Sequence, residues 1–145
     1  MIFDRTLLFS NAQAIVADAA STDIVNLGAT GTAYGHAAAL VRDIGKGQCI
    51  PLLIQVVEAF NTLTSLRVVV QCDDNEAFSS AKDVLEVTLP LASLTVGRQF
   101  PLVCVPPGVN ERYMRIYYDV IGTAPTLGKV TAGVVMGVQT NGVTF

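Results

Sequence analysis

Alternation of apolar and polar residues along short segments is the feature that most constrains the fold of this chain. In an extended segment, Leu66 and Val68 share one face and Arg67 lies between them on the other. Because the side chains of a β-strand point alternately to its two faces, this pattern predicts a strand with one buried face. The segments with this alternation are residues 65–73, 84–91 and 112–122.

Other segments, rich in Val, Ile and Leu, predict further strands, and turn-forming residues separate them. These segments are residues 23–27, 50–57, 100–105 and 129–138. Short strands at this spacing, without long helices between them, favour an antiparallel β-sandwich of jelly-roll type over a parallel α/β fold. The expected fold is therefore all-β, with one domain over residues 1–145 and at most one short helix.

Two segments are ambiguous in their periodicity. Residues 12–20 fit both a helical stripe and strand alternation, and we expect a strand there. Residues 75–82 are expected to form a short helix in a connection, with Asp74 or Asn75 as its cap. The glycine-rich stretch from Gly28 to Gly35 predicts a long loop.

The composition favours a chain that binds other proteins. Hydrophobic residues make up 51% of the chain and charged residues only 14%, against about 25% charged residues in an average protein. Apolar surface therefore remains for a partner chain to cover. The net charge is −3 and the nine Lys and Arg residues are scattered. Neither nucleic acid nor a membrane surface is expected as a partner, because both attract clustered positive charge.

The cysteines and the start of the chain indicate synthesis in a reducing cytosol. Cys49, Cys72 and Cys104 are widely spaced, each within an apolar run. This favours small buried thiols over a disulfide, a reactive thiol or a zinc site. Ser10 and Asn11 interrupt any signal-peptide core, and no apolar stretch approaches the ~20 residues of a membrane span. We therefore expect a soluble protein.

No motif predicts an enzyme, a cofactor or a metal. His36 is the only histidine and no GxSxG motif accompanies it, so we expect a structural or solvated imidazole. The spacing of the glycines from Gly28 to Gly35 fits no nucleotide fingerprint. The acidic cluster at residues 73–76 fails the EF-hand frame, because Phe78 and Val84 occupy its sixth and twelfth positions. We expect a solvated turn there.

The chain resembles the capsid cement proteins of Bordetella-phage type, which belong to short-tailed phages. Its start resembles that of the family in residues 7–14 (LLFSNAQA) and 21–28 (STDIVNLG). Residues 60–68 (FNTLTSLRV) are similar to the family's entry to a central strand, and residues 128–133 (GKVTAG) also fit. These patterns carry no chemistry, so their order and the overall length carry the resemblance.

The resemblance implies a jelly-roll protein on the outer surface of an icosahedral head, made in the host cytoplasm. It also implies that the protein bridges subunits of the major capsid protein, with a homodimer favoured. No catalytic residue comes with the family. One alternative is a receptor- or carbohydrate-binding jelly-roll module of a tail or head fibre. A third hypothesis is a small hydrolase, which would use His36, Glu58 or Glu111.

The expected contacts to the capsid lie at the chain ends and in the glycine-rich loop. Residues 1–9 are a candidate N-terminal arm and residues 143–145 a candidate tail, because apolar residues at chain ends need something to pack against. Packing on their own domain is an equally weighted alternative. The loop of residues 28–47 is the third candidate. The candidate contact residues are Phe3, Leu7, Leu8, Phe9, Tyr34 and Phe145.

Overall fold

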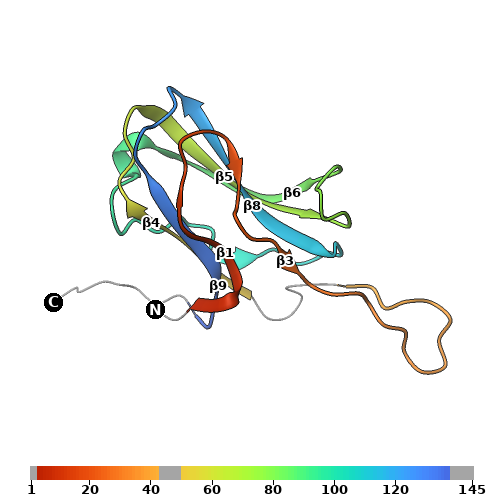
Figure 1. The fold of residues 1–145 in the computed structure, drawn as a ribbon. Helices are drawn as coiled ribbons and strands as arrows, with labels where there is room; N and C mark the ends of the chain where they lie inside the picture. The colour runs from red at the N-terminus through yellow and green to blue at the C-terminus, as the bar shows by residue number, and fades with distance from the viewer. Residues whose placement is uncertain (1–2, 43–49, 138–145) are drawn as a thin grey trace.

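The protein folds into two antiparallel β-sheets that face each other, and the computed structural model describes residues 3–42 and 50–137 (Figure 1). Cys49 and the tail at residues 143–145, with Phe145, lie outside the described residues. The strands of the first sheet, in spatial order, are β1 (Phe3–Ala14), β9 (Lys129–Val135), β4 (Ile50–Glu58) and β7 (Cys104–Val105). The strands of the second are β2 (Ala19–Ala20), β8 (Tyr113–Gly122), β5 (Leu63–Asp73) and β6 (Lys82–Pro90), with β3 (Val25–Asn26) also paired to β8.

The strand order is that of a jelly roll. β2 and β3 pair with the same strand, β8, and so act as one interrupted strand. Each sheet then has four strand positions, and the first and last strands, β1 and β9, are neighbours. The chain crosses between the sheets at every connection except β2 to β3 and the β5–β6 hairpin. Eight positions connected in this way confirm the all-β sandwich predicted from the alternation.

The core lies between the sheets and contains the apolar sides of the alternating strands. In β5, Leu66, Val68 and Val70 have no exposed surface, and they face residues of β1, β4 and β9 such as Phe9. Each such side chain contributes roughly 1.5–3 kcal/mol by leaving water. The inward faces of the long strands were therefore predicted correctly.

The two ambiguous segments are both divided by turns. Residues 12–20 contain the end of β1 and all of β2, which belong to different sheets. Between them Ile15 enters the core, and its N–H donates to the carbonyl of Gly128 at 3.0 Å. The helix expected at residues 75–82 is wrong, because residues 75–80 form turns and Lys82 is the first residue of β6. Among the described residues, helical structure occurs as one 3₁₀ turn, η1 (Leu91–Ser93).

The carboxylate of Asp73 organises the turn between β5 and β6. It is buried and accepts hydrogen bonds from the N–H groups of Asn75 (2.9 Å) and Ser80 (2.8 Å) and from the Ser80 hydroxyl (3.0 Å). A side chain that satisfies the backbone of a turn in this way competes with helix formation. The acidic cluster is therefore a structural turn, as its composition suggested, although Asp73 itself is not solvated.

We expect the protein to lose stability at acid pH partly through Asp73. The hydrogen bonds, first that from Asn75, lower the pKa of Asp73 below its ordinary value. The resulting stabilisation is complete above the unfolded-chain value of about 3.9 and is lost as the pH falls through the lower pKa of the folded state. Urea unfolding between about pH 3 and pH 5 should show a steeper loss for the wild type than for Asp73→Asn, with Ser80→Ala intermediate. Parallel pH profiles for the wild type and Asp73→Asn would contradict this assignment.

A buried hydrogen bond crosses the sandwich between β1 and β8. The hydroxyl groups of Ser10 and Tyr118 lie 2.8 Å apart, and neither residue has exposed surface. The Ser10 hydroxyl also donates to the Oε1 atom of Gln13, whose amide nitrogen donates to the carbonyl of Ala20 in β2. This network ties the first sheet to the second at the edge where β2 begins.

Removal of the Tyr118 hydroxyl is expected to destabilise the fold by about 1 kcal/mol. Tyr118→Phe deletes one partner of a buried hydrogen bond and leaves the aromatic packing in place, and losses of this kind cost about that much. The free energy of unfolding measured in urea checks the value. Tyr117→Phe, on the opposite face of β8, is the matched control and should change little. Equal effects of the two substitutions would contradict the role of the cross-sheet bond.

Candidate protein-interaction surface

A long loop leaves β3 and projects from the sandwich. We call residues 28–42 the projecting loop, which is the orange segment that extends away from the two sheets in Figure 1. It includes the glycine-rich stretch, residues 28–35, that was predicted to form a long loop. Connections usually run over the surface of a domain. A segment that stands away from the domain therefore keeps a defined shape only through hydrogen bonds of its own.

The two arms of the projecting loop pair as a short hairpin. Thr32 and Ala39 form an antiparallel bridge. The N–H of Leu40 donates to the carbonyl of Gly31 at 2.9 Å. These backbone contacts hold the arms side by side, so the loop has a defined shape despite its glycine content.

Tyr34 lies at the tip of this hairpin. The N–H of His36 donates to the carbonyl of Ala33 at 3.0 Å, which closes a four-residue turn. Gly35 has φ +81° at the third position of this turn, a conformation that favours glycine in type II turns. The side chain of Tyr34 is fully exposed. The turn therefore presents an aromatic ring at the most distant part of the loop.

Arg42 ties the two ends of the projecting loop together. Its guanidinium donates to the carbonyls of Glu111 (2.8 Å), Gly28 and, more weakly, Leu27 (3.5 Å). The backbone N–H of Arg42 donates to the Oδ1 atom of Asn110 at 2.7 Å. Because Gly28 begins the loop and Arg42 ends it, one side chain fixes both ends on the body. A cleft of about 430 Å³, lined in part by Asn110 and Arg42, lies at this junction.

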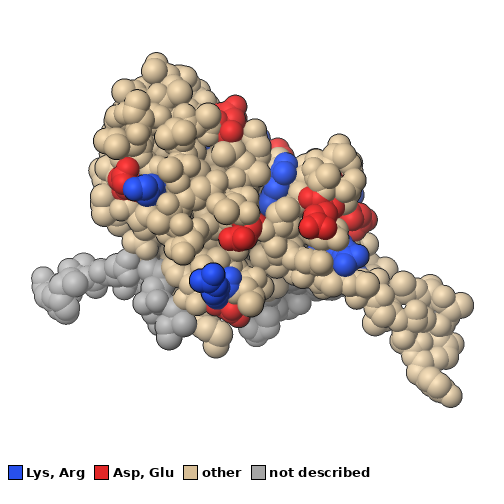
Figure 2. Space-filling view, viewed as in Figure 1, with Lys and Arg blue, Asp and Glu red and all other residues tan. Residues whose placement is uncertain are grey.

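The surface of the projecting loop carries no ionic side chain before Arg42. Residues 24–41 contain no Asp, Glu, Lys or Arg, and Figure 2 shows the protrusion without red or blue atoms. Leu40 and Val41 expose 56% and 76% of their surface. Exposed apolar side chains near the base of the hairpin, together with an aromatic ring at its tip, are typical of a protein-binding surface.

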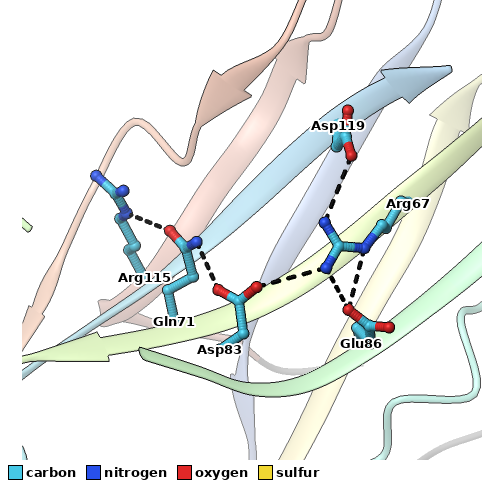
Figure 3. A network of polar contacts seen from close by, with 6 residues as sticks. All are labelled: Arg67, Gln71, Asp83, Glu86, Arg115 and Asp119. Atoms are coloured by element: carbon cyan, nitrogen blue, oxygen red, sulfur yellow. Dashed lines mark hydrogen bonds and ion pairs between the residues drawn. The ribbon is translucent and has the colours of Figure 1, made fainter. Parts of the chain in front are cut away.

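The outer face of the β8–β5–β6 sheet differs from the projecting loop because it carries a network of ion pairs (Figure 3). Arg67 lies at its centre and contacts three carboxylates, at 3.0 Å (Glu86), 3.4 Å (Asp83) and 3.5 Å (Asp119). Asp83 also accepts a hydrogen bond from Gln71 at 2.8 Å. The hydrogen bond to Glu86 raises the pKa of Arg67. Exposed pairs of this kind contribute ~0–1 kcal/mol each. Three carboxylates around one guanidinium leave this face with excess negative charge, whereas the cores of protein interfaces are poor in charge. The projecting loop is therefore the stronger candidate for a binding surface.

The proposed contact residues of the N-terminal arm lie in β1. Phe3 pairs with Val135, and Phe3, Leu7 and Leu8 are half-buried. Phe9 has no exposed surface and belongs to the core. Leu7 and Phe9 also line a small apolar cavity of about 160 Å³ at the end of the sandwich. Residues 3–9 therefore begin strand β1 of the sandwich and do not form an arm separate from it. A contact of Phe3, Leu7 and Leu8 with the capsid stays a prediction.

The residues named for a hydrolase are separate in their contacts. Glu58 pairs with Lys129 at 2.6 Å, and this contact lowers the pKa of Glu58. Glu111 pairs with Lys82, and His36 is exposed near the hairpin tip. Within residues 3–42 and 50–137, no group of three or more His, Cys, Asp or Glu side chains is placed to hold a metal ion.

The cysteines divide into two kinds. Cys72 is a free thiol without exposed surface, and burial raises its pKa to about 12. It fits the prediction of an inert buried thiol. Cys104 is disulfide-bonded, so the prediction of a free thiol is wrong for that residue. Wide spacing in the sequence did not reveal this, because strand pairing brings distant residues together.

Sequence reasoning placed Tyr34 among the contact residues but missed the role of Arg42. The available signal was the run of 18 residues without formal charge, residues 24–41, which Arg42 ends. An arginine next to a glycine-rich loop has many possible partners, and its contact with the carbonyl of Glu111 joins positions 69 residues apart. Only the folded chain shows this contact.

Comparison with known proteins identifies a family. No curated protein matches the chain. In the part of the chain that the structure describes, no helix is both long enough and apolar enough to cross a membrane. The family model described as Bbp16 matches residues 9–134, which include β1 from Phe9 onward, β2 to β8, β9 as far as Val134, and the projecting loop. The chain therefore belongs to the Bbp16 family, whose name suggests a Bordetella phage protein.

Proposed function

We propose that this protein is a virion structural protein that binds the outer surface of an icosahedral phage head. In this role it bridges subunits of the major capsid protein and stabilises the head. The observation that carries the proposal is the projecting loop, which presents Tyr34 and an uncharged surface from a rigid jelly roll. The Bbp16 family supports a phage origin, and the resemblance to cement proteins supplies the partner.

The physical requirements of a cement protein agree with this surface. A standard interface buries ~800 Å² per partner, worth about 20 kcal/mol gross at ~25 cal/mol per Å² before the large costs of association. When one copy contacts two capsid subunits, the second contact forms at high effective concentration. Moderate contacts at each subunit then give a tight joint. The net charge of −3 disfavours binding of the protein to DNA, which is itself negatively charged.

Oligomerisation is part of the proposal. A homodimer doubles the number of projecting loops and so allows one particle to reach two capsid subunits. In this arrangement the protein is made in the host cytoplasm and assembles on the completed head. Neither nucleic acid nor a membrane takes part.

Binding to heads that lack this protein is the experiment that tests the function. The purified protein should co-sediment with such heads, saturate at a fixed number of copies, and raise the temperature at which the heads release DNA. Cryo-electron microscopy of the complex should show jelly-roll density above the boundaries between capsid subunits. An unrelated β-sandwich of similar size is the control. Density confined to a tail or head fibre would instead support the receptor- or carbohydrate-binding module, and absence from the particle would refute both.

A further inference from the structure

We infer that Arg42 is a positioning residue that holds the projecting loop as a preformed hairpin, and that this hairpin enters an uncharged groove of a folded protein partner with Tyr34 leading. This inference rests on the proposed function for the identity of the partner. The behaviour of the hairpin in the free protein can be tested without any partner.

The side chain of Arg42 joins the two ends of the hairpin at its base. The loop begins at Gly28 and ends at Arg42, and the Arg42 guanidinium donates to the carbonyl of Gly28 and to that of Glu111 on the body. A guanidinium has five N–H donors in a planar fork, whereas an ammonium is a single point of charge. Arginine can therefore hold several carbonyls at once in fixed directions, which lysine cannot reproduce. Asn110 adds a hydrogen bond from its side chain to the Arg42 backbone.

The contacts of Arg42 with the carbonyls of Gly28 and Glu111, which we call the clamp, lower the entropy that the loop loses on binding. A free glycine-rich loop loses much conformational freedom when a partner orders it, and this loss weakens the complex. The bridge between Thr32 and Ala39 and the turn that carries Tyr34 are already formed in the isolated protein. With both ends fixed by Arg42, most of the ordering takes place during folding and little remains for association.

The composition of the loop indicates the chemistry of the surface that it contacts. The 14 residues of the loop before Arg42 have no formal charge, and ten of them are Gly, Ala or Thr. A buried charge in the partner would find no counter-charge in these residues, which is strongly unfavourable. Small side chains make the hairpin narrow, and its largest exposed side chains are Tyr34, His36, Leu40 and Val41. The matching surface is a narrow groove of uncharged and apolar side chains.

Hydrogen exchange in the free protein tests the clamp. Arg42→Met keeps the length of the side chain and removes the guanidinium, and Arg98→Met is the matched control because Arg98 is exposed in another loop. In Arg42→Met the N–H groups of Leu40 and His36 should exchange at least about tenfold faster, because local opening becomes easier. Thermal unfolding of the sandwich should match that of Arg98→Met. Arg42→Lys should resemble Arg42→Met. Unchanged exchange at Leu40 in Arg42→Met would overturn the clamp.

Binding to heads tests the second half of the inference. Arg42→Met should bind at least about tenfold more weakly than Arg98→Met, because the hairpin must be ordered on association. Tyr34→Ala should bind at least about tenfold more weakly with normal exchange at Leu40, and Tyr34→Phe should restore most of the affinity. Faster exchange with undiminished binding would overturn the role of preorganisation. If the wild type does not bind heads, the proposed function fails, whereas the exchange result still decides the clamp.

Discussion

Substitution of Gly128 by alanine is expected to destabilise the sandwich by about 3 kcal/mol or more. Gly128 precedes β9 with φ +135°, a conformation that L-residues rarely adopt. A Cβ atom there would lie 2.3 Å from the Cδ1 atom of Phe60 and 2.5 Å from its Cε1 atom. Phe60 is buried in the core, so its ring cannot move aside without opening a cavity. Urea unfolding of Gly128→Ala measures the loss.

The matched control for this prediction is Gly97→Ala. Gly97 also has a positive φ, +85°, but a Cβ atom there would meet nothing within 4 Å. This substitution therefore reports the backbone cost alone, about 1–2 kcal/mol. Phe60→Leu combined with Gly128→Ala should recover part of the difference, because the smaller side chain relieves the overlap. Equal destabilisation by Gly128→Ala and Gly97→Ala would show that Phe60 accommodates the added methyl group.

Replacement of residues 30–40 by a short Gly-Ser linker is expected to weaken binding to phage heads by at least about a hundredfold. The change removes Tyr34 and Leu40 together, and anchors of this kind each contribute ~2 kcal/mol or more when they fill a pocket of the partner. The foot of the loop, where Arg42 contacts Gly28, remains. Thermal unfolding of the variant should match that of the wild type, because the replaced residues lie outside the core. Co-sedimentation with heads measures the affinity.

Val96→Ser is the control for the loss of exposed apolar surface. Val96 is 66% exposed in the connection after η1 and lies outside the projecting loop. It should bind heads as the wild type does, whereas Tyr34→Ser should bind more weakly. Binding of the linker variant with undiminished affinity would show that the projecting loop is not part of the interface. The binding surface would then lie on the faces of the sheets.

The strands that could be predicted are those with one buried face. β5 and β8 carry an apolar–polar alternation over most of their length, and this periodicity reports which side chains leave water. The shortest strands show the limit of this signal. The segment at residues 100–105 contains only the two residues of β7. Two bridges to β4 define that strand, and no local pattern encodes them. Val69 shows a second limit, because it faces away from the core and is nevertheless fully buried.

The candidate site was only partly predictable for the same reason. The composition of residues 28–35 indicates a loop, and Tyr34 stands out as a large residue among small ones. The direction in which the loop projects depends on contacts with residues 110–111, which lie far along the chain. Phe9 illustrates the opposite case, since an apolar residue near a chain end resembles a docking anchor until the pairing of β1 with β9 places it in the core.

The sequence by itself determined that the chain is an all-β sandwich with a charge-poor surface, because alternation and composition are local properties that determine which side chains leave water. Tertiary structure alone decided how the two sheets are connected, which apolar residues remain exposed, and how Arg42 closes the projecting loop. Those features depend on contacts between residues far apart in the chain, and such contacts exist only once the two sheets have packed together.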